Sequence, residues 1–233
     1  MNIIQVIIAK LRFHLWAKLK INFYPSFYQS HSQFGEDMIV RGLIPNLNTG
    51  FYVDIGSHHP VLISNTYHFY CKGWRGINID AIPGSMELFK ILRPRDINLE
   101  ACLSKVDNSE AFFFIFDPAP FNTCDPQVAE YLIANDVKFI EKIKLKTRTL
   151  KSCLDECLPD GVEIDLMNID IEGMDEEILM SNDWNHYKPK ILIFEKKVHS
   201  IQEICNSSII DFLNKIGYNI VAISGYSVIL QLQ

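Results

Sequence analysis

Acidic and small residues recur at the ends of the apolar strands that the sequence predicts, and these residue types can hold a small ligand. The strand ends are Asp54-Ile-Gly56-Ser57, Asp80, Ser104 and Asp170-Ile-Glu172-Gly173. In an open α/β sheet, ligands bind beyond the carboxyl ends of the central strands. We therefore expect these residues to line one site, to which three of the four strand ends bring carboxylates.

The segment after the first strand lacks the features that bind phosphate groups. A dinucleotide site requires Gly-x-Gly-x-x-Gly, because the pyrophosphate contacts bare backbone at a helix N-terminus. Counting from Gly56, His58 occupies the second glycine position and Val61 the third. The chain also has no Gly-x-x-x-x-Gly-Lys run, which forms the phosphate loop of nucleotide hydrolases. We expect neither NAD nor a nucleoside triphosphate at this site.

S-adenosylmethionine carries no phosphate, and its functional groups suit these residues. Its ribose hydroxyls can donate to a carboxylate such as Asp80, and its sulfonium and ammonium groups are attracted by acids such as Asp54. Gly56 allows the backbone to approach the cofactor closely. The step of 26 residues from Asp54 to Asp80 is near the ~20 expected between a glycine turn and a ribose-binding acid. We expect S-adenosylmethionine as the cofactor.

Three residues are candidates for catalysis. His58 or its neighbour His59 could act as a general base, because imidazole titrates near neutral pH, and we select His58. Asp170 and Glu172 are two positions apart at a strand end and so point to one side. One of this pair would orient the acceptor or the cofactor, and either could be the base.

A metal ion is not expected. The run Asn168-x-Asp170-x-Glu172-Gly173 resembles the start of a calcium loop, but its twelfth position is Leu179 instead of glutamate. The six cysteines include no Cys-x-x-Cys pair that would favour zinc. A divalent ion held by Asp170, Glu172 and a substrate diol is the alternative, and turnover that survives EDTA would exclude it.

The charge distribution separates the N-terminal segment from the rest of the chain. The formal net charge is −6, and the residues up to Gly35 carry +4, so the remainder carries −10. An acidic body disfavours a nucleic-acid partner, which usually requires a basic surface. The chain has no apolar run of membrane-spanning length and no convincing secretory signal, so we expect a cytoplasmic protein with reduced thiols.

Residues 1–30 are expected to form a helical appendage to one domain over residues 31–233. Apolar residues recur there at helical spacing, at Ile4, Ile8, Leu11, Leu15 and Leu19. This stripe would pack on the domain. Alternatively, residues 1–20 would lie on a membrane surface, because Phe13, Trp16 and four cations accompany the stripe. In that case the protein would be cytoplasmic and associated with a membrane.

Strands and helices alternate along the domain, which predicts a mostly parallel, doubly wound α/β sheet. An insertion over about 105–147 is expected to hold a strand at 110–116, a loop at 117–126, a helix at 126–135 and a strand at 142–147. A long helix is expected at about 201–215. Strands at 218–223 and 226–232 would form an antiparallel hairpin around Ser224-Gly225.

Short motifs along residues 32–195 resemble, in order, those of FkbM-like methyltransferases. They are Ser32-Gln-Phe-Gly-Glu-Asp37, Val53-Asp-Ile-Gly-Ser-His-His-Pro60, Ser64-Asn-Thr66, Gly73-Trp-Arg-Gly76, Arg93-Pro94, Thr147-Arg-Thr-Leu150 and Ile169-Asp-Ile-Glu-Gly173. The resemblance implies a class I, seven-stranded fold that uses S-adenosylmethionine. It also implies O-methylation of a hydroxyl on a sugar, a glycan or another natural product. Asp80-Ala81 departs from the Glu-Pro that is more common in this family.

The same resemblance assigns roles to individual residues. Asp54, Gly56 and Ser57 would cradle the methionine moiety and ribose, while Asp80 binds ribose and Ser104 flanks adenine. Gln33 and Glu36 would fold over the cofactor, and Asn65 would cap a helix or contact the cofactor. Two other functions stay open, namely a non-catalytic binding module with this fold and a methyltransferase acting on nucleic acid or protein. The acidic body disfavours the second of these.

Overall fold

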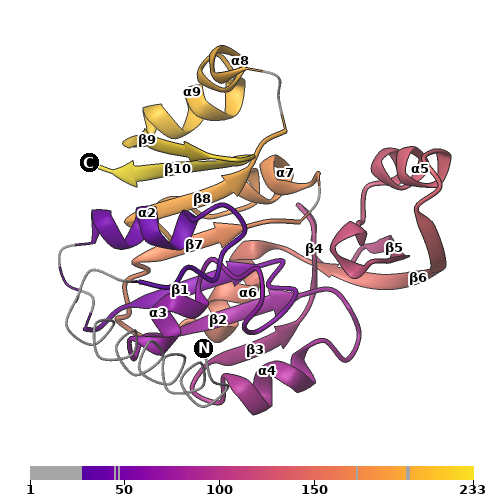
Figure 1. The fold of residues 1–233 in the computed structure, drawn as a ribbon, viewed down its shortest axis with the longest axis horizontal. Coiled ribbons are helices and arrows are strands. Elements are labelled where there is room, and N and C mark those ends of the chain that lie inside the picture. Colours follow the sequence, from indigo (N-terminus) through magenta and orange to yellow (C-terminus); the bar gives the residue numbers. More distant parts are fainter. Residues whose placement is uncertain (1–27, 45, 47, 172, 198–199) are drawn as a thin grey trace, which may run out of the picture. The chain divides into compact units, whose positions relative to one another are not determined.

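The computed structural model describes residues 28–44, 46, 48–171, 173–197 and 200–233. Residues His31–Gln233 form one compact unit, built on a seven-stranded sheet in the order β3-β2-β1-β7-β8-β10-β9 (Figure 1). The strands are β1 Phe51–Ile55, β2 Arg75–Asp80, β3 Ile97–Glu100, β7 Leu166–Ile169, β8 Ile191–Glu195, β9 Tyr218–Ser224 and β10 Ser227–Leu232.

Strands β3, β2, β1, β7 and β8 run parallel, and β10 is antiparallel to both β8 and β9. All residues of β1 and of β7 are buried, as expected for parallel strands with helices on both faces of the sheet. The predicted fold is therefore confirmed, including its antiparallel C-terminal hairpin. The strand order reverses between β1 and β7, and ligands bind at such a point in open α/β sheets.

Alternation along β1 sends side chains to two hydrophobic cores. Val53 and Ile55 pack in the larger core with α6 Leu150–Cys157, α7 Asp175–Met180 and α9 Ser208–Lys215. Tyr52 points to the other face and packs in a core that includes residues of α2 Glu36–Leu43 and α3 Tyr67–Cys71. Helix α4 Met86–Leu92 buries Met86 and Phe89. The helices thus cover both faces and leave the ends of the strands accessible.

The insertion forms an arm beside the main sheet (Figure 1). It contains β5 Glu110–Asp117, the short helix η1 Ala119–Phe121, α5 Pro126–Ala134 and β6 Lys138–Arg148, and β4 Cys102–Leu103 directly precedes it. Strands β5 and β6 pair antiparallel, and β4 pairs parallel with Thr147 and Arg148 at the end of β6, which gives a three-stranded sheet in the order β4-β6-β5. Helix α5 begins after Asp125, whose carboxylate accepts the Gln127 N–H at 2.7 Å, an N-cap of the usual kind.

The largest differences from the sequence prediction concern one helix and two strands. The long helix at 201–215 is divided into α8 Ile201–Cys205 and α9, because α9 starts anew after Ser207. The third strand ends at Glu100, where the Ala101 N–H turns to the Asp80 carbonyl and Cys102 pairs with β6. Strand β6 is longer than predicted because it pairs with all of β5.

The predicted helix at the N-terminus lies outside the described residues. In the part of the chain that the structure describes, no helix has the length and apolar character needed to cross a membrane.

Candidate functional site

A cavity of about 430 Å³ lies at the carboxyl edge of the main sheet. Strands β1, β2, β7 and β8 each bring a residue from their carboxyl end to its lining, namely Gly56, Asp80, Asp170 and Glu195. The arm supplies a further wall through Phe113 and residues 118–124. The cavity therefore sits at the reversal of strand order, where the topology places ligands.

Gly56 allows two loops to meet at the bottom of the cavity. Its φ is +73°, and a Cβ atom added there would lie 1.7 Å from the carbonyl oxygen of Asp170. Its N–H donates to the Ile79 carbonyl at 2.9 Å, which holds the loop against β2. No side chain fits at this position, so the loop after β1 exposes bare backbone beside the loop after β7.

Asp80 lines the cavity and also fixes the loop after β1. Its Oδ2 accepts the His58 N–H at 2.9 Å, and its Oδ1 accepts the Ile82 N–H at 2.8 Å. Burial raises the pKa of the Asp80 carboxyl from its ordinary value, against the opposing effect of these hydrogen bonds. Each carboxylate oxygen can accept more than one hydrogen bond, so capacity remains for hydroxyl groups of a ligand.

The adjacent histidines have different surroundings. His58 has a φ of +49° and lines the cavity. The Nδ1 atom of His59 accepts the N–H groups of Val61 at 3.0 Å and of Leu62 at 2.9 Å. Burial lowers the pKa of His59 below its ordinary value. His59 thus stabilises the turn that follows, and His58 is the histidine placed to meet a ligand.

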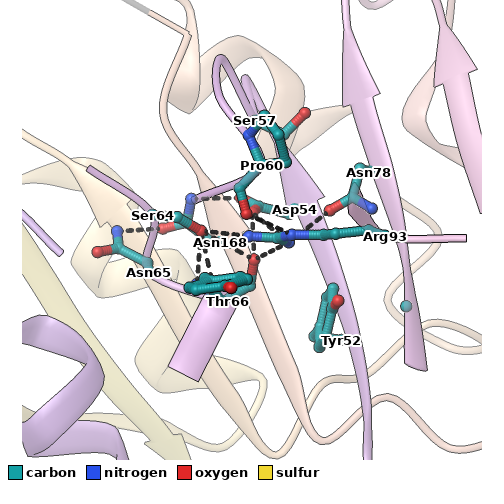
Figure 2. A network of polar contacts seen from close by, with 12 residues as sticks. Tyr52, Asp54, Ser57, Pro60, Ser64, Asn65, Thr66, Asn78, Arg93 and Asn168 are labelled. Carbon is teal, nitrogen blue, oxygen red and sulfur yellow. Dashed lines mark hydrogen bonds and ion pairs between the residues drawn. The ribbon is translucent and has the colours of Figure 1, made fainter. Parts of the chain in front are cut away.

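A buried arginine lies beneath this loop (Figure 2). Arg93, at the C-cap of α4, is fully buried. Its guanidinium donates to the Pro60 carbonyl at 2.7 Å, to Ser64 Oγ at 2.7 Å and to Thr66 Oγ1 at 2.8 Å. These three acceptors belong to the segment between β1 and α3. Arg93 therefore anchors the segment that carries His58.

A row of polar side chains crosses the sheet next to Arg93. Asn98, Asn78, Asp54 and Asn168 occupy paired positions on β3, β2, β1 and β7. Asn168 Nδ2 donates to Asp54 Oδ1 at 2.9 Å, and Asn78 Nδ2 donates to Asn98 Oδ1 at 2.8 Å. Arg93 Nη1 donates to Asn78 Oδ1 at 3.0 Å and lies 4.0 Å from Asp54 Oδ2. The row is thus hydrogen-bonded within the sheet and joined by one cation.

Asp54 and Asn65 lie in this network and not on the cavity lining. Asp54 Oδ2 accepts the Thr66 hydroxyl at 2.5 Å, and Asn65 Nδ2 donates to Asn168 Oδ1 at 2.8 Å. Asp54 is 2% exposed, so its charge is balanced by Arg93 inside the protein. Through these contacts, both residues connect the segment before α3 to strands β1 and β7.

A second buried carboxylate supports the loops after β7 and β8. Asp175 is 3% exposed, and its Oδ1 accepts the Glu195 N–H at 3.2 Å. Burial raises the pKa of Asp175 to about 7, an effect to which the nearby Glu195 charge adds. Glu195 also forms an ion pair of 3.1 Å with Lys197, which lines the cavity too. Asp175 thus fixes the position from which Glu195 faces the cavity.

The structure divides the eleven residues proposed from the sequence into three groups. The cavity lining contains Gln33, Gly56, His58, Asp80 and Asp170. Another five lie outside this lining: Glu36, Asp54, Ser57, Asn65 and Ser104. Glu172 is outside the described residues.

Three of the residues outside the lining bond to other parts of the protein. Glu36 accepts the Phe34 N–H at 2.9 Å and the Ser227 hydroxyl at 3.0 Å. Ser57 Oγ donates to the Ile79 carbonyl at 3.3 Å, and Ser104 Oγ donates to Glu177 at 3.3 Å. The sequence reasoning placed them at the ligand, whereas their hydrogen bonds hold neighbouring segments together.

Sequence reasoning missed Glu195, Lys197 and Tyr226, and it named no residue of the wall from the arm as a site residue. Glu195 ends a strand as Asp80 and Asp170 do, so the same strand-end rule could have found it. The wall carries no comparable signal, because residues 118–124 have neither periodicity nor a charged motif. Within the described residues, no group of three or more His, Cys, Asp or Glu side chains is arranged to hold a metal ion.

The model of the FkbM methyltransferase domain matches residues 54–220, which is more than half of the chain. The chain belongs to the FkbM methyltransferase family. The family uses S-adenosylmethionine as methyl donor, so the predicted family and cofactor are both confirmed. The matched range includes the residues at the ends of β1, β2, β7 and β8 that line the cavity.

Several solved structures are similar to this chain. A TehB-like SAM-dependent methyltransferase from Corynebacterium glutamicum is 10% identical, with 96% of this chain and 97% of that chain covered and a TM-score of 0.43. A precorrin-6y C5,15-methyltransferase from Geobacter metallireducens is 13% identical, with coverages of 84% and 88% and a TM-score of 0.41. An O-methyltransferase from Bacillus cereus in complex with SAH is 9% identical, with coverages of 97% and 91% and a TM-score of 0.38. No curated protein matches the chain.

The cavity has the chemistry that S-adenosylmethionine requires. Among the described residues, its lining holds the carboxylates Asp80, Asp170 and Glu195 and one lysine or arginine, Lys197, so these charged side chains favour a positively charged ligand. Apolar side chains such as Leu103 and Phe113 offer contact area for an aromatic base. The bare backbone at Gly56 allows close approach. The residues present therefore fit the cofactor of the family.

Proposed function

We propose that this FkbM-family protein is an O-methyltransferase that methylates a hydroxyl group on a sugar, a glycan or another small natural product. The observation that carries the proposal is one cavity in which Gly56 and Asp80 adjoin His58 and Asp170. A volume of about 430 Å³ lies within the ~300–1,000 Å³ typical of small-molecule sites. The arm closes one side of this cavity with apolar residues, which suits a small acceptor with an apolar face.

We assign Asp80 to the ribose of the cofactor and the loop at Gly56 to its methionine portion. Asp80 is held by two backbone N–H groups, so its carboxylate is preorganised before a ligand arrives. Bound S-adenosylmethionine supplies an activated methyl group on a sulfonium. Residues Leu103 and Phe113 would flank the adenine, in place of the serine that the sequence suggested.

We assign the general base to His58, with Asp170 orienting the acceptor hydroxyl. His58 lines the cavity and is fixed through its backbone by Asp80. Because the methyl donor is already activated, the enzyme mainly has to position the acceptor oxygen, and the base removes the proton late. Asp170 is attached to the loop that passes Gly56, so it reaches the same space from β7.

Methyl transfer from a radiolabelled donor to a panel of sugars, glycans and polyketide-like alcohols tests the proposal. We expect label in an acceptor hydroxyl with the full-length protein, and loss of label with His58→Ala. Binding of S-adenosylhomocysteine measured by calorimetry separates two failures. Binding without transfer to any acceptor would favour the non-catalytic binding module, and label in protein or nucleic acid would contradict the acceptor class. Membrane contact through residues 1–20 stays a prediction, which co-sedimentation with anionic vesicles tests.

A further inference from the structure

Two cysteines meet at the wall of the cavity. The Sγ atoms of Cys102 and Cys124 are 3.1 Å apart, and both residues are free thiols. Cys102 lies in β4 and is 2% exposed. Cys124 belongs to residues 118–124, the wall that the arm places against the cavity, and it lines the cavity itself. One thiol is therefore reachable from the cavity, and the other is directly behind it.

Within the arm, the residues of this wall form hydrogen bonds with β5. The backbone of Thr123 exchanges hydrogen bonds of 2.9 and 3.2 Å with Phe114 of β5, and Asn122 Oδ1 accepts the Phe116 N–H at 2.7 Å. The contact between the thiols runs in a different direction, to β4. Strand β4 follows β3 directly along the chain, beginning two residues after its end, and pairs with the end of β6. A bond between the sulfurs would attach the wall to β4.

The wall also reaches the loop after β7. A Cβ atom placed on Gly173 would lie 3.1 Å from Val128 Cγ2 and 3.4 Å from Asp125 Oδ2 in the first turn of α5. Cys124 immediately precedes Asp125. Fixing Cys124 would therefore restrain the segment that spans the cavity between β4 and the loop after β7.

We propose that Cys102 and Cys124 form a thiol–disulfide exchange site, at which a low-molecular-weight disulfide such as oxidised glutathione converts the two thiols to a disulfide that fastens the cavity wall to β4. This inference does not depend on the proposed acceptor or on methyl transfer. It concerns a reversible covalent modification of the wall.

The reaction takes place in two exchanges. Cys124 attacks the small disulfide from the cavity, which forms a mixed disulfide and releases one small thiol carrying the Cys124 proton. Cys102 then attacks the Cys124 sulfur, and the second small thiol leaves with the Cys102 proton. The protein loses two electrons and two protons, and the small disulfide gains them.

The short distance between the two sulfurs favours the second exchange. The sulfurs, at 3.1 Å, need to approach by about 1 Å to reach the bond length of a disulfide. Rotation of the side chains can supply a movement of this size.

Peptide mapping of full-length Cys71→Ser/Cys205→Ser protein tests the modification. This background removes the two exposed thiols and leaves four. After treatment with oxidised glutathione, we expect the thiols alkylated under denaturing conditions to fall from four to two. Trypsin should then yield residues 96–105 joined to residues 106–138, because each of these peptides contains one cysteine. Dithiothreitol should separate the peptides.

Single substitutions in this background separate the two steps. With Cys102→Ser, we expect a persistent glutathione adduct on Cys124. With Cys124→Ser, we expect no adduct on Cys102, because its thiol is buried. Cys153 and Cys157 are one turn apart on α6 and share another tryptic peptide, which makes them the internal control. Four alkylatable thiols after treatment, or a cross-link at this control pair in place of Cys102–Cys124, would overturn the proposal.

Hydrogen–deuterium exchange tests the fastening. In the oxidised protein, the amides of residues 121–125 should exchange more slowly than in the reduced protein, while the amides of β9 keep their rates. Equal rates at 121–125 in a fully cross-linked sample would show that the disulfide forms without fastening the wall.

Discussion

Asparagine in place of Asp175 should change how the stability of the fold depends on pH. Asp175 is 3% exposed and accepts the Glu195 N–H at 3.2 Å. Asparagine has nearly the same shape and retains an oxygen to accept that hydrogen bond. It cannot ionise, so the substitution removes the charge and leaves the packing in place. The comparison therefore isolates the effect of titrating one buried carboxyl.

The magnitude follows from the raised pKa. Burial raises the pKa of Asp175 from 3.8 to about 7, a shift of about three units at 1.36 kcal/mol each, or about 4 kcal/mol in total. Between these values the folded protein holds a proton that the unfolded chain has lost. The stability contributed by neutral Asp175 is therefore fully present below about pH 4, and it decreases as the pH rises through about 7.

Urea denaturation between pH 4.5 and 8 measures this effect. The free energy of unfolding of Asp175→Asn relative to the unmodified protein should rise with pH by about 1.4 kcal/mol per unit, and level off above pH 7. Taking the difference cancels the titration of groups that both proteins share. Asp211→Asn, at an exposed position of α9, is the matched control. A difference that is flat across this range for Asp175→Asn would refute the reasoning.

Three further substitutions test the network and the site. Arg93→Met should destabilise the fold by about 3–5 kcal/mol, because it leaves the buried Asp54 carboxylate without its cation; an unchanged urea midpoint would contradict this. Asp80→Ala should weaken binding of S-adenosylhomocysteine by about 1.5–3 kcal/mol for each lost hydrogen bond. Equal affinity of the two proteins in calorimetry would show that Asp80 does not contact the ligand. His58→Ala should abolish turnover and keep that affinity, whereas retained turnover would assign the base elsewhere.

Much of the architecture could be predicted from the sequence, because the alternation of apolar strands and helices is a local pattern. The rule that ligands bind at strand ends then brought Gly56, Asp80 and Asp170 to one cavity without knowledge of the strand order. The split of the helix at 201–215 was missed because Asn206 and Ser207 are also compatible with a continuous helix. In the structure, Ser207 is the N-cap of α9 and separates it from α8.

Asp54 shows why the rest could not be predicted. At the end of an apolar strand, an aspartate that faces a ligand and one that faces a neighbouring strand have the same sequence pattern. The distinction depends on pairing of Asp54 with Asn78 and Asn168, and on an arginine that arrives from α4. The available signal was a polar residue at an interior position of each of four strands rich in apolar residues. The wall of residues 118–124 depends on how the arm folds, which no local pattern encodes.

The row of polar residues across β3, β2, β1 and β7 also has a consequence for how the sheet assembles. A slip of one residue between β1 and either neighbour would place Asp54 against an aliphatic side chain and leave its charge unsatisfied. A shifted register is therefore disfavoured. The aliphatic residues of these strands would not select the register by themselves, because they could pack in either alignment. Asn168 contributes to this selectivity directly, and Arg93 at the end of α4 adds the compensating cation. Correct alignment of the central strands and docking of α4 should therefore stabilise each other.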